Sequence, residues 1–366
     1  MSLVFFISGH GFGHASRDVE VLNAFGRLRP DVRLIIRSAV SPRLLRRTLT
    51  VNYELRPGAC DTGIVQATSV SQDDAATVRE ATAFYETFDD RIATETQALA
   101  GDGVRLIVGD IAPLAFEVAD RLGVPSIALG NFTWDWIYEQ HPGFLEEGAA
   151  ILPALRRAYG LATRAMALPF SAGFEVFPRI EHTPLVARLP TYSRADARAT
   201  LGLPLDRPIA LLSFGGYGLA SLDLRTLDCL DRWTVLTTDQ STSSTTGAPA
   251  HVRFIREDDL TGSGVRYEDM VAAADVVVTK PGYGIISECI AGGTGMLYTS
   301  RGQFREYDVL VREIPRYLRC RFISQADLFA GRWLDALEEV RSMPSPPERL
   351  EPTGASWIAR ALSEYF

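Results

Sequence analysis

The chain has 366 residues, a formal net charge of −8 and 46% hydrophobic residues, which is enough apolar content for more than one core. The acidic balance excludes nucleic acid and anionic membrane surfaces as main partners, because both require a basic surface. The four cysteines form no CxxC pair, which argues against a zinc knuckle or a disulfide framework. The N-terminus has no basic leader segment and no run is apolar enough to cross a membrane, so we expect a cytoplasmic protein.

Short β-branched runs alternate with longer helical patterns along the whole chain, which predicts parallel sheets covered by helices. In the first half the predicted strands are 3–8, 32–37, 51–56, 104–108 and 124–129, and the predicted helices are 14–28, 73–99 and 112–122, before a last helix and strand near 145–168. In the second half the predicted strands are 209–213, 233–238, 252–255, 275–279 and 295–299. The pattern predicts an α/β protein with two tandem Rossmann-like domains.

A proline-rich segment separates the two halves. Residues 169–208 contain six prolines and few long apolar runs, which is typical of a connector. We therefore divide the chain into an N-terminal domain (1–180), a C-terminal domain (181–345) and a terminal helix (346–366) that could pack back on the first domain.

Glycine-rich turns follow two strands of the predicted second sheet. In the strand order 3-2-1-4-5, strands 1 and 4 are neighbours, and ligands bind at their carboxyl ends. These ends carry FGGYG (214–218) and KPGYG (280–284). Glycine lets backbone N–H groups approach a phosphate, and a following helix adds its positive end, although a single such loop is often only a turn. The residues expected to bind a nucleotide diphosphate are Gly215, Gly216, Lys280, Gly282, Gly284, Ser287 and Glu288, and Lys280 is the only lysine of the chain.

The opening motif SGHGFGH (8–14) follows the first predicted strand. It reads GxGxG, one residue short of the dinucleotide fingerprint, and the second strand ends in Arg37 rather than in an acid. This weakens a nicotinamide site, but Arg37 would suit a 2′-phosphate, so an NADP-dependent enzyme stays open as an alternative.

His14 opens a helix, and Asp110 ends the neighbouring strand of the first predicted sheet. A carboxylate that holds one ring nitrogen would leave the other free to deprotonate a hydroxyl. The pair is our predicted catalytic site, with His10 as an alternative base. In the alternative structural interpretation both residues only cap helices. The chain has no DxD motif, so we expect no metal cofactor.

Three segments, GHGFGHASR, NFTWDWIYE (131–139) and KPGYGIISE, resemble the GT-B nucleotide-sugar glycosyltransferases, including the bacterial enzyme that adds N-acetylglucosamine to a lipid-linked peptidoglycan precursor. A narrower likeness is to the glycosyltransferase-like N-terminal half of L-arabinokinases and related bacterial stand-alone proteins. The resemblance implies a GT-B fold and an inverting, metal-independent transfer from a nucleoside-diphosphate sugar to an acceptor hydroxyl.

The resemblance also assigns roles to residues. Gly215, Gly216 and Ser287 would lie near phosphate, Glu288 on the ribose, and His14 would be the base, oriented by Asp110. The segment RGQFREYD (301–308) would grip the donor sugar, although it lacks the expected DQ or QQ pair. The residues expected to contact substrate are His10, Gly11, Gly13, Trp134, Gln303, Arg305 and Glu306.

The aromatic run FTWDWIY (132–138) would either wall the acceptor site, which suits a small aglycone or a lipid, or form a core strand. Two further alternatives remain from the same residues: a non-catalytic nucleotide-sugar-binding protein and a hydrolysing sugar epimerase.

Overall fold

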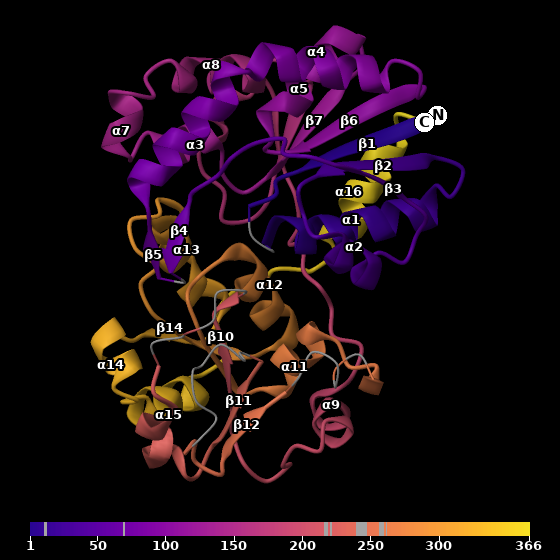
Figure 1. The fold of residues 1–366 in the computed structure, drawn as a ribbon. Helices are drawn as coiled ribbons and strands as arrows, with labels where there is room; N and C mark the ends of the chain where they lie inside the picture. The colour runs from indigo at the N-terminus through magenta and orange to yellow at the C-terminus, as the bar shows by residue number, and fades with distance from the viewer. Residues whose placement is uncertain are drawn as a thin grey trace.

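The structure is a computed structural model that describes residues 1–366 except 11–12, 69, 216–218, 220–221, 239–246, 256–259 and 261. Two parallel sheets, each covered by helices, lie one above the other in Figure 1. This confirms the predicted α/β class with two Rossmann-like units in tandem.

The first sheet contains seven strands. The interior strand Ser2–Ile7 has the sequence SLVFFI and is buried along its whole length, as expected for a parallel strand with helices on both faces. The predicted order 3-2-1-4-5 is confirmed, and two further strands extend it. In spatial order the strands are β3 (Glu54–Pro57), β2 (Arg33–Ser38), β1 (Ser2–Ile7), β6 (Val104–Asp110), β7 (Ser126–Gly130), β8 (Arg164–Ala167) and β9 (Ile180–His182).

The helices of the first half differ from prediction at two places. The predicted helix 73–99 is interrupted at Thr87, whose φ of −107° and ψ of 17° are not helical. Residues 134–138 form a short helix, so the expectation of a core strand in the aromatic run is wrong. The helices are α1 (Gly13–Leu28), α2 (Pro42–Thr48), α3 (Asp74–Glu86), α4 (Phe88–Leu99), α5 (Pro113–Leu122), α6 (Trp134–Tyr138), α7 (Pro142–Leu145), α8 (Ile151–Gly160) and the 3₁₀ turn η1 (Phe174–Val176).

The second sheet repeats the same order and adds one strand that the sequence pattern did not predict, β15. Its strands are β12 (Val252–Phe254), β11 (Thr234–Thr237), β10 (Ile209–Ser213), β13 (Val276–Thr279), β14 (Gly295–Tyr298) and β15 (Cys320–Phe322). The helical elements are α9 (Arg194–Thr200), η3 (Leu224–Leu230), α11 (Tyr267–Ala273), α12 (Tyr283–Gly292), α13 (Glu306–Tyr317), α14 (Gln325–Phe329), α15 (Leu334–Ser342) and α16 (Gly354–Ser363).

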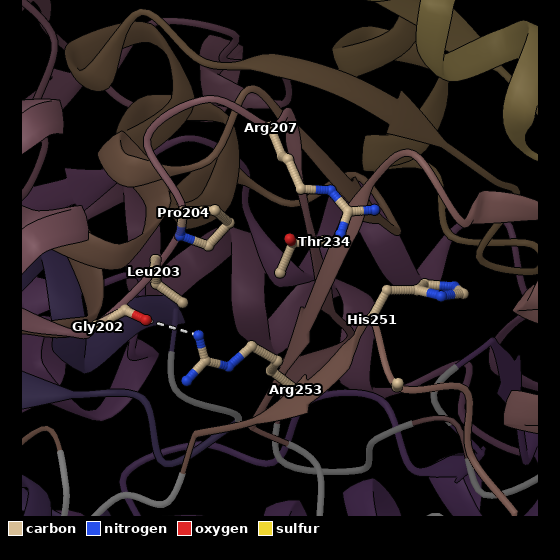
Figure 2. Close-up of a pocket in the computed structure, with 8 residues that line it drawn as sticks. Gly202, Leu203, Pro204, Arg207, Thr234, His251 and Arg253 are labelled. Carbon is tan, nitrogen blue, oxygen red and sulfur yellow. Dashed lines mark hydrogen bonds between the residues drawn. The ribbon is translucent and has the colours of Figure 1, made fainter.

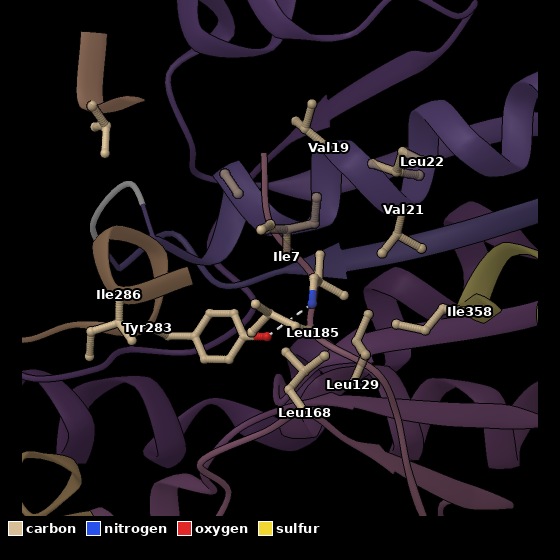
Figure 3. Packing of buried hydrophobic residues seen from close by; sticks show 14 of the residues in the cluster. Ile7, Val19, Val21, Leu22, Leu129, Leu168, Leu185, Tyr283, Ile286 and Ile358 are labelled. Carbon is tan, nitrogen blue, oxygen red and sulfur yellow. Dashed lines mark hydrogen bonds between the residues drawn. The ribbon is translucent and has the colours of Figure 1, made fainter. Parts of the chain in front are cut away.

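The two halves share buried contacts. The terminal helix α16 packs against α1, and the rings of Phe25 and Phe366 lie 5.7 Å apart. The Tyr283 hydroxyl of α12 accepts a hydrogen bond of 3.3 Å from the backbone N–H of Val186 in the connector, and Figure 3 shows this side chain beside Leu185. One hydrophobic cluster therefore runs from the first sheet through the connector to the second.

A small hairpin of the first half, formed by β4 (Gln66–Thr68) and β5 (Ser71–Gln72), reaches the second half. Figure 1 shows it beside α13. Val70 at its turn packs against the hydrophobic cluster of the second half. Gly302 of the second half also lies close to this turn. A Cβ built on Gly302 would be 3.5 Å from the carbonyl oxygen of Val70, an ordinary van der Waals distance. The hairpin thus carries residues of the first half to the strand ends of the second.

Candidate functional site

The predicted strand ends carry the candidate site in both sheets. In the first sheet Ile7, the last residue of β1, pairs in register with Asp110, the last residue of β6. In the second sheet Ser213 pairs with Thr279, so that Lys280 follows directly. Residues from both positions interact with each other, which places the two strand ends at one site.

His14 and Asp110 are hydrogen-bonded. His14 Nδ1 lies 2.7 Å from Asp110 Oδ2, and the imidazole is only 7% exposed. Burial alone would raise the pKa of Asp110, but the positive charges of Arg17 and His14 outweigh it and lower this pKa to about 2. The ionised carboxylate holds the Nδ1–H tautomer, and no described residue is hydrogen-bonded to Nε2. Nε2 is therefore available to take a proton.

A chain of buried hydrogen bonds, here called the Arg17–Arg301 bridge, leads from Asp110 to the second half. Arg17 donates to Asp110 Oδ1 and, at 2.7 Å, to Asn131 Oδ1. Asn131 in turn donates to Glu306 Oε1 at 2.7 Å, and Arg301 donates to Glu306 Oε2 at 3.0 Å. The Asp110 carboxylate is thus connected through Arg17 and Asn131 to Glu306 and Arg301, which lie after β14.

Asp18 lies on the same turn of α1 and is fully buried. Neither of its oxygens finds a donor among the described residues. Burial, followed by the negative charge of Asp110, raises the pKa of Asp18 well above its ordinary value. The proximity of Asp110 thus opposes ionisation of both carboxyls at once.

Positive charge collects on the other side of the site. Lys280 Nζ lies 3.3 Å from Gln66 Oε1 of the β4–β5 hairpin, and among the residues that the structure describes it has no acidic partner. Burial and then the charge of Arg301 lower the pKa of Lys280 to about 7. Burial, followed by the charges of His14, Arg301 and Lys280, lowers the pKa of His10 to about 3. The positive charges of Lys280 and Arg301 repel each other, so an anion bound beside them would be strongly stabilised.

The glycines around Lys280 leave room for a ligand. Gly215 has a φ of +70°, a backbone conformation that favours glycine. Among the residues that the structure describes, a Cβ built on Gly215 or Gly284 would meet no atom within 4 Å, and one on Gly282 would meet Arg301 Nη1 alone, at 3.9 Å. Gly282 is also the N-cap of α12, so the positive end of this helix points to the same place. Gly216 and Gly11 lie outside the described residues, and Gly13 is the first residue of α1.

Two residues predicted to face the nucleotide are engaged inside the chain. The Ser287 hydroxyl donates to the carbonyl of Gly284 at 2.8 Å. Glu288 is buried against Arg188 of the connector, whose Nε donates to it at 2.7 Å. The connector thus supplies Glu288 with a buried counter-charge that lies 100 residues away in sequence.

The predicted sugar-gripping segment is divided in the same way. Glu306 is almost fully buried, and each of its oxygens accepts a hydrogen bond within the bridge. The Arg305 guanidinium lies 4.5 Å from the centre of the Trp136 ring and donates to the Trp136 carbonyl at 2.6 Å. Gln303 is exposed. Of these three residues, Glu306 alone contacts a described residue near Lys280, through its hydrogen bond with Arg301.

The predicted aromatic wall is turned into the core. Trp134 has no exposed surface, and its indole donates to Asp61 Oδ2 at 2.8 Å. Its ring lies 5.8 Å from that of His10 and 6.1 Å from that of His14. Trp134 therefore packs against the two histidines and does not face a substrate. Arg37, the residue suited to a 2′-phosphate, is bound by Glu95, with its Nε 2.8 Å from Oε1.

Sequence reasoning missed four polar residues of this site: Arg17, Asp61, Asn131 and Arg301. Arg17 follows His14 by three residues on one helix, a spacing that places both on one face and could have indicated it. Asn131 follows β7 directly, at the same sheet edge as Asp110. Arg301 is the first residue of the segment RGQFREYD, which the resemblance already assigned to the donor sugar. For Asp61, which lies in a loop, the sequence carries no such signal.

A pocket of about 380 Å³ lies away from these strand ends (Figure 2). Its basic side chains are already hydrogen-bonded to backbone carbonyls. Arg253 donates to Gly202 at 2.6 Å, Arg207 donates to Asp231, and His251 Nε2 lies 3.0 Å from the carbonyl of Leu227. This pocket therefore offers little free positive charge to a ligand.

The described part of the chain contains no group of three or more His, Cys, Asp and Glu side chains that could hold a metal ion. Within the same residues, the helices are too short or too polar to cross a membrane.

No protein-family model matches the chain. L-arabinokinase of Arabidopsis thaliana is 26% identical over 347 residues, which cover 93% of this chain and 32% of that protein. The UDP-N-acetylglucosamine--N-acetylmuramyl-(pentapeptide) pyrophosphoryl-undecaprenol N-acetylglucosamine transferase of Clavibacter michiganensis subsp. michiganensis is 29% identical over 235 residues, 62% of this chain and 58% of that enzyme. The chain therefore spans less than two thirds of the length of either relative.

Solved structures match over nearly the whole length. The glycotransferase of kitacinnamycin has a TM-score of 0.67 at 16% identity and covers 100% of this chain and 99% of its own. The glycosyltransferase VinC in complex with DTDP has a TM-score of 0.59 at 17% identity, with 100% and 95% covered. MurG of Acinetobacter baumannii has a TM-score of 0.56 at 13% identity, with 99% of both chains covered. The chain therefore has the fold of the GT-B glycosyltransferases.

Proposed function

We propose that the chain transfers a sugar from a nucleoside-diphosphate sugar to the hydroxyl group of an acceptor. The observation that carries the proposal is the group formed by Lys280, Arg301 and the positive end of α12, in which Lys280 has no acidic partner among the described residues. A diphosphate supplies the missing negative charge. The names of similar proteins support it, since one is a UDP-N-acetylglucosamine transferase and another was solved with DTDP.

His14 acts as the base in the proposed reaction. Nε2 takes the proton of the acceptor hydroxyl as its oxygen attacks the anomeric carbon, and Asp110 stabilises the imidazolium that forms. The bond between the anomeric carbon and the diphosphate oxygen breaks, and its electron pair leaves with the nucleoside diphosphate. Lys280, Arg301 and the end of α12 stabilise that leaving group.

Attack from the side opposite the leaving group inverts the anomeric centre in a single displacement, so we propose an inverting reaction. We also propose that it needs no metal cofactor, because Lys280, Arg301 and the helix end supply the positive charge that the departing diphosphate requires. The nucleoside-diphosphate sugar is a co-substrate in this scheme.

A thermal-shift panel tests the donor side of the proposal. UDP, GDP, dTDP and their sugars are added to the wild-type protein, to Lys280→Ala and to Arg321→Ala, which removes only an exposed ion pair with Glu339. We expect at least one nucleotide to raise the melting temperature of the wild type and of Arg321→Ala, since saturation a hundredfold above the Kd adds about 2.7 kcal/mol. The shift should be lost or strongly reduced in Lys280→Ala. No shift with any nucleotide, or an undiminished shift in Lys280→Ala, contradicts the proposal.

A further inference from the structure

A cavity of about 520 Å³ opens at the carboxyl ends of β1, β2 and β3. Gly9 and His10 lie on its wall after β1, Ala39 after β2 and Asp61 after β3, while α3 and α4 supply the remaining side. His10 borders the cavity and packs edge-on against Trp134, which also lies beside His14. The cavity therefore lies close to the proposed base, with His10 and Trp134 linking the two.

The lining of this cavity combines apolar side chains, among them Ala39, Ala83 and Phe84, with a group of polar ones. Its charged and hydroxyl-bearing members are Asp61, Thr62, Glu80 and Arg91, and the backbone around them carries small residues. Phe84 contributes an aromatic ring to the lining but is itself almost fully buried, and Trp134, the residue predicted to face the acceptor, has no exposed surface and packs within the core of the first half. Two carboxylates against one guanidinium also disfavour an anionic ligand.

Asp61 is the best-defined group of the lining. It is 5% exposed, and its two oxygens accept hydrogen bonds from Ser8 Oγ at 3.1 Å and Trp134 Nε1 at 2.8 Å. A carboxylate has about four acceptor positions, so two donors leave positions open for a ligand. The side chain is fixed from behind by these two bonds, which is the arrangement that a specific hydrogen bond to a ligand requires.

We infer that this cavity binds a small, uncharged polyhydroxyl acceptor, such as a sugar or a cyclic polyol, with Asp61 and Glu80 accepting hydrogen bonds from its hydroxyls and Arg91 donating to one of its oxygens. The inference rests on the proposed function and names its acceptor. The cavity is within the usual size range of small-molecule sites, roughly 300–1,000 Å³, and large enough for one or two sugar rings. It replaces the expectation of an apolar aglycone or lipid, which depended on an exposed aromatic wall.

Saturation-transfer NMR on the intact protein tests the inference without any donor. The probes are aldopentoses, aldohexoses and myo-inositol, together with a phenol and a medium-chain alcohol as apolar competitors. We expect at least one polyol to bind and the two apolar probes not to compete with it. Asp61→Asn and Glu80→Gln should each weaken binding by roughly tenfold, the loss of one hydrogen bond to a charged group.

The variants are chosen so that misfolding is not an explanation. Asn at position 61 still accepts from Trp134, and its amide can donate to the Ser8 hydroxyl, while Glu80 is exposed. Glu86→Gln, exposed on the same helix, is the matched control and should bind as the wild type does. Binding of the apolar probes alone, no polyol binding, or equal binding by all variants overturns the inference. A protein that binds polyol but no nucleotide contradicts the proposed function instead.

Discussion

The Arg17–Arg301 bridge makes a quantitative prediction for Asn131→Ala. The Asn131 amide accepts from Arg17 and donates to Glu306, both at 2.7 Å, and all three side chains are buried. Removal of the amide deletes two hydrogen bonds to charged partners and leaves a guanidinium N–H and a carboxylate oxygen unpaired. Each such loss costs about 1.5–3 kcal/mol, so the free energy of unfolding should fall by roughly 3–6 kcal/mol.

Urea denaturation followed by tryptophan fluorescence measures this change. The control is Arg225→Ala, which breaks an ion pair with Asp223 in which both side chains are largely exposed, and it should cost at most about 1 kcal/mol. A double-mutant cycle with Glu306→Gln should give a coupling energy of roughly 0.5–3 kcal/mol, because the two side chains are in direct contact. If Asn131→Ala costs no more than the control, or if the two substitutions are additive, the reasoning about the bridge is refuted.

Three further predictions concern charge and pH. Lys280, whose pKa is about 7, should take up as much as one proton when a diphosphate binds at pH 8. Calorimetry in buffers of different ionisation enthalpy measures this uptake, and Lys280→Arg should show none. Arg188→Ala leaves Glu288 buried without its counter-charge, while Glu268 keeps its ion pair with Arg266, and the substitution should lower the free energy of unfolding by about 3–5 kcal/mol in urea. A loss below about 1 kcal/mol would show that the Arg188–Glu288 pair is not important for stability. Burial raises the pKa of Asp61 to about 6, so the native state binds this proton more tightly than the unfolded state does. The wild type should therefore lose stability as the pH rises from about 4 to about 6. Asp61→Asn should lose less stability over the same interval.

The sequence predicted the parts of the site that depend on strand order. Once β1 and β6 are neighbours, His14 and Asp110 follow at adjacent strand ends, and the structure brings them to 2.7 Å. The same geometry places Lys280 after β13, beside the end of β10. Local sequence patterns are enough to predict these positions, because the position of each residue depends only on its own strand and on the helix or turn that follows it.

The contacts between distant segments were not predictable in this way. Asn131 and Glu306 are 175 residues apart, and Arg188 and Glu288 are 100 residues apart. Pairings of this kind depend on how the two halves meet, which no periodicity in the chain reports. Trp134 was assigned to the acceptor for a related reason: an alternating aromatic run does not show which of its members the neighbouring helices bury.

Turnover by His14→Ala tests the central claim most directly. The claim is that one site holds a nucleotide diphosphate near Lys280 while His14 removes a proton from the acceptor. With a donor that binds the wild type and an acceptor from the polyol panel, we measure release of the nucleoside diphosphate and, separately, the affinity for the nucleotide. We predict that His14→Ala keeps its nucleotide affinity and loses turnover by roughly 10²–10⁴-fold, the usual contribution of a general base. Equal turnover by the wild type and His14→Ala would contradict the account.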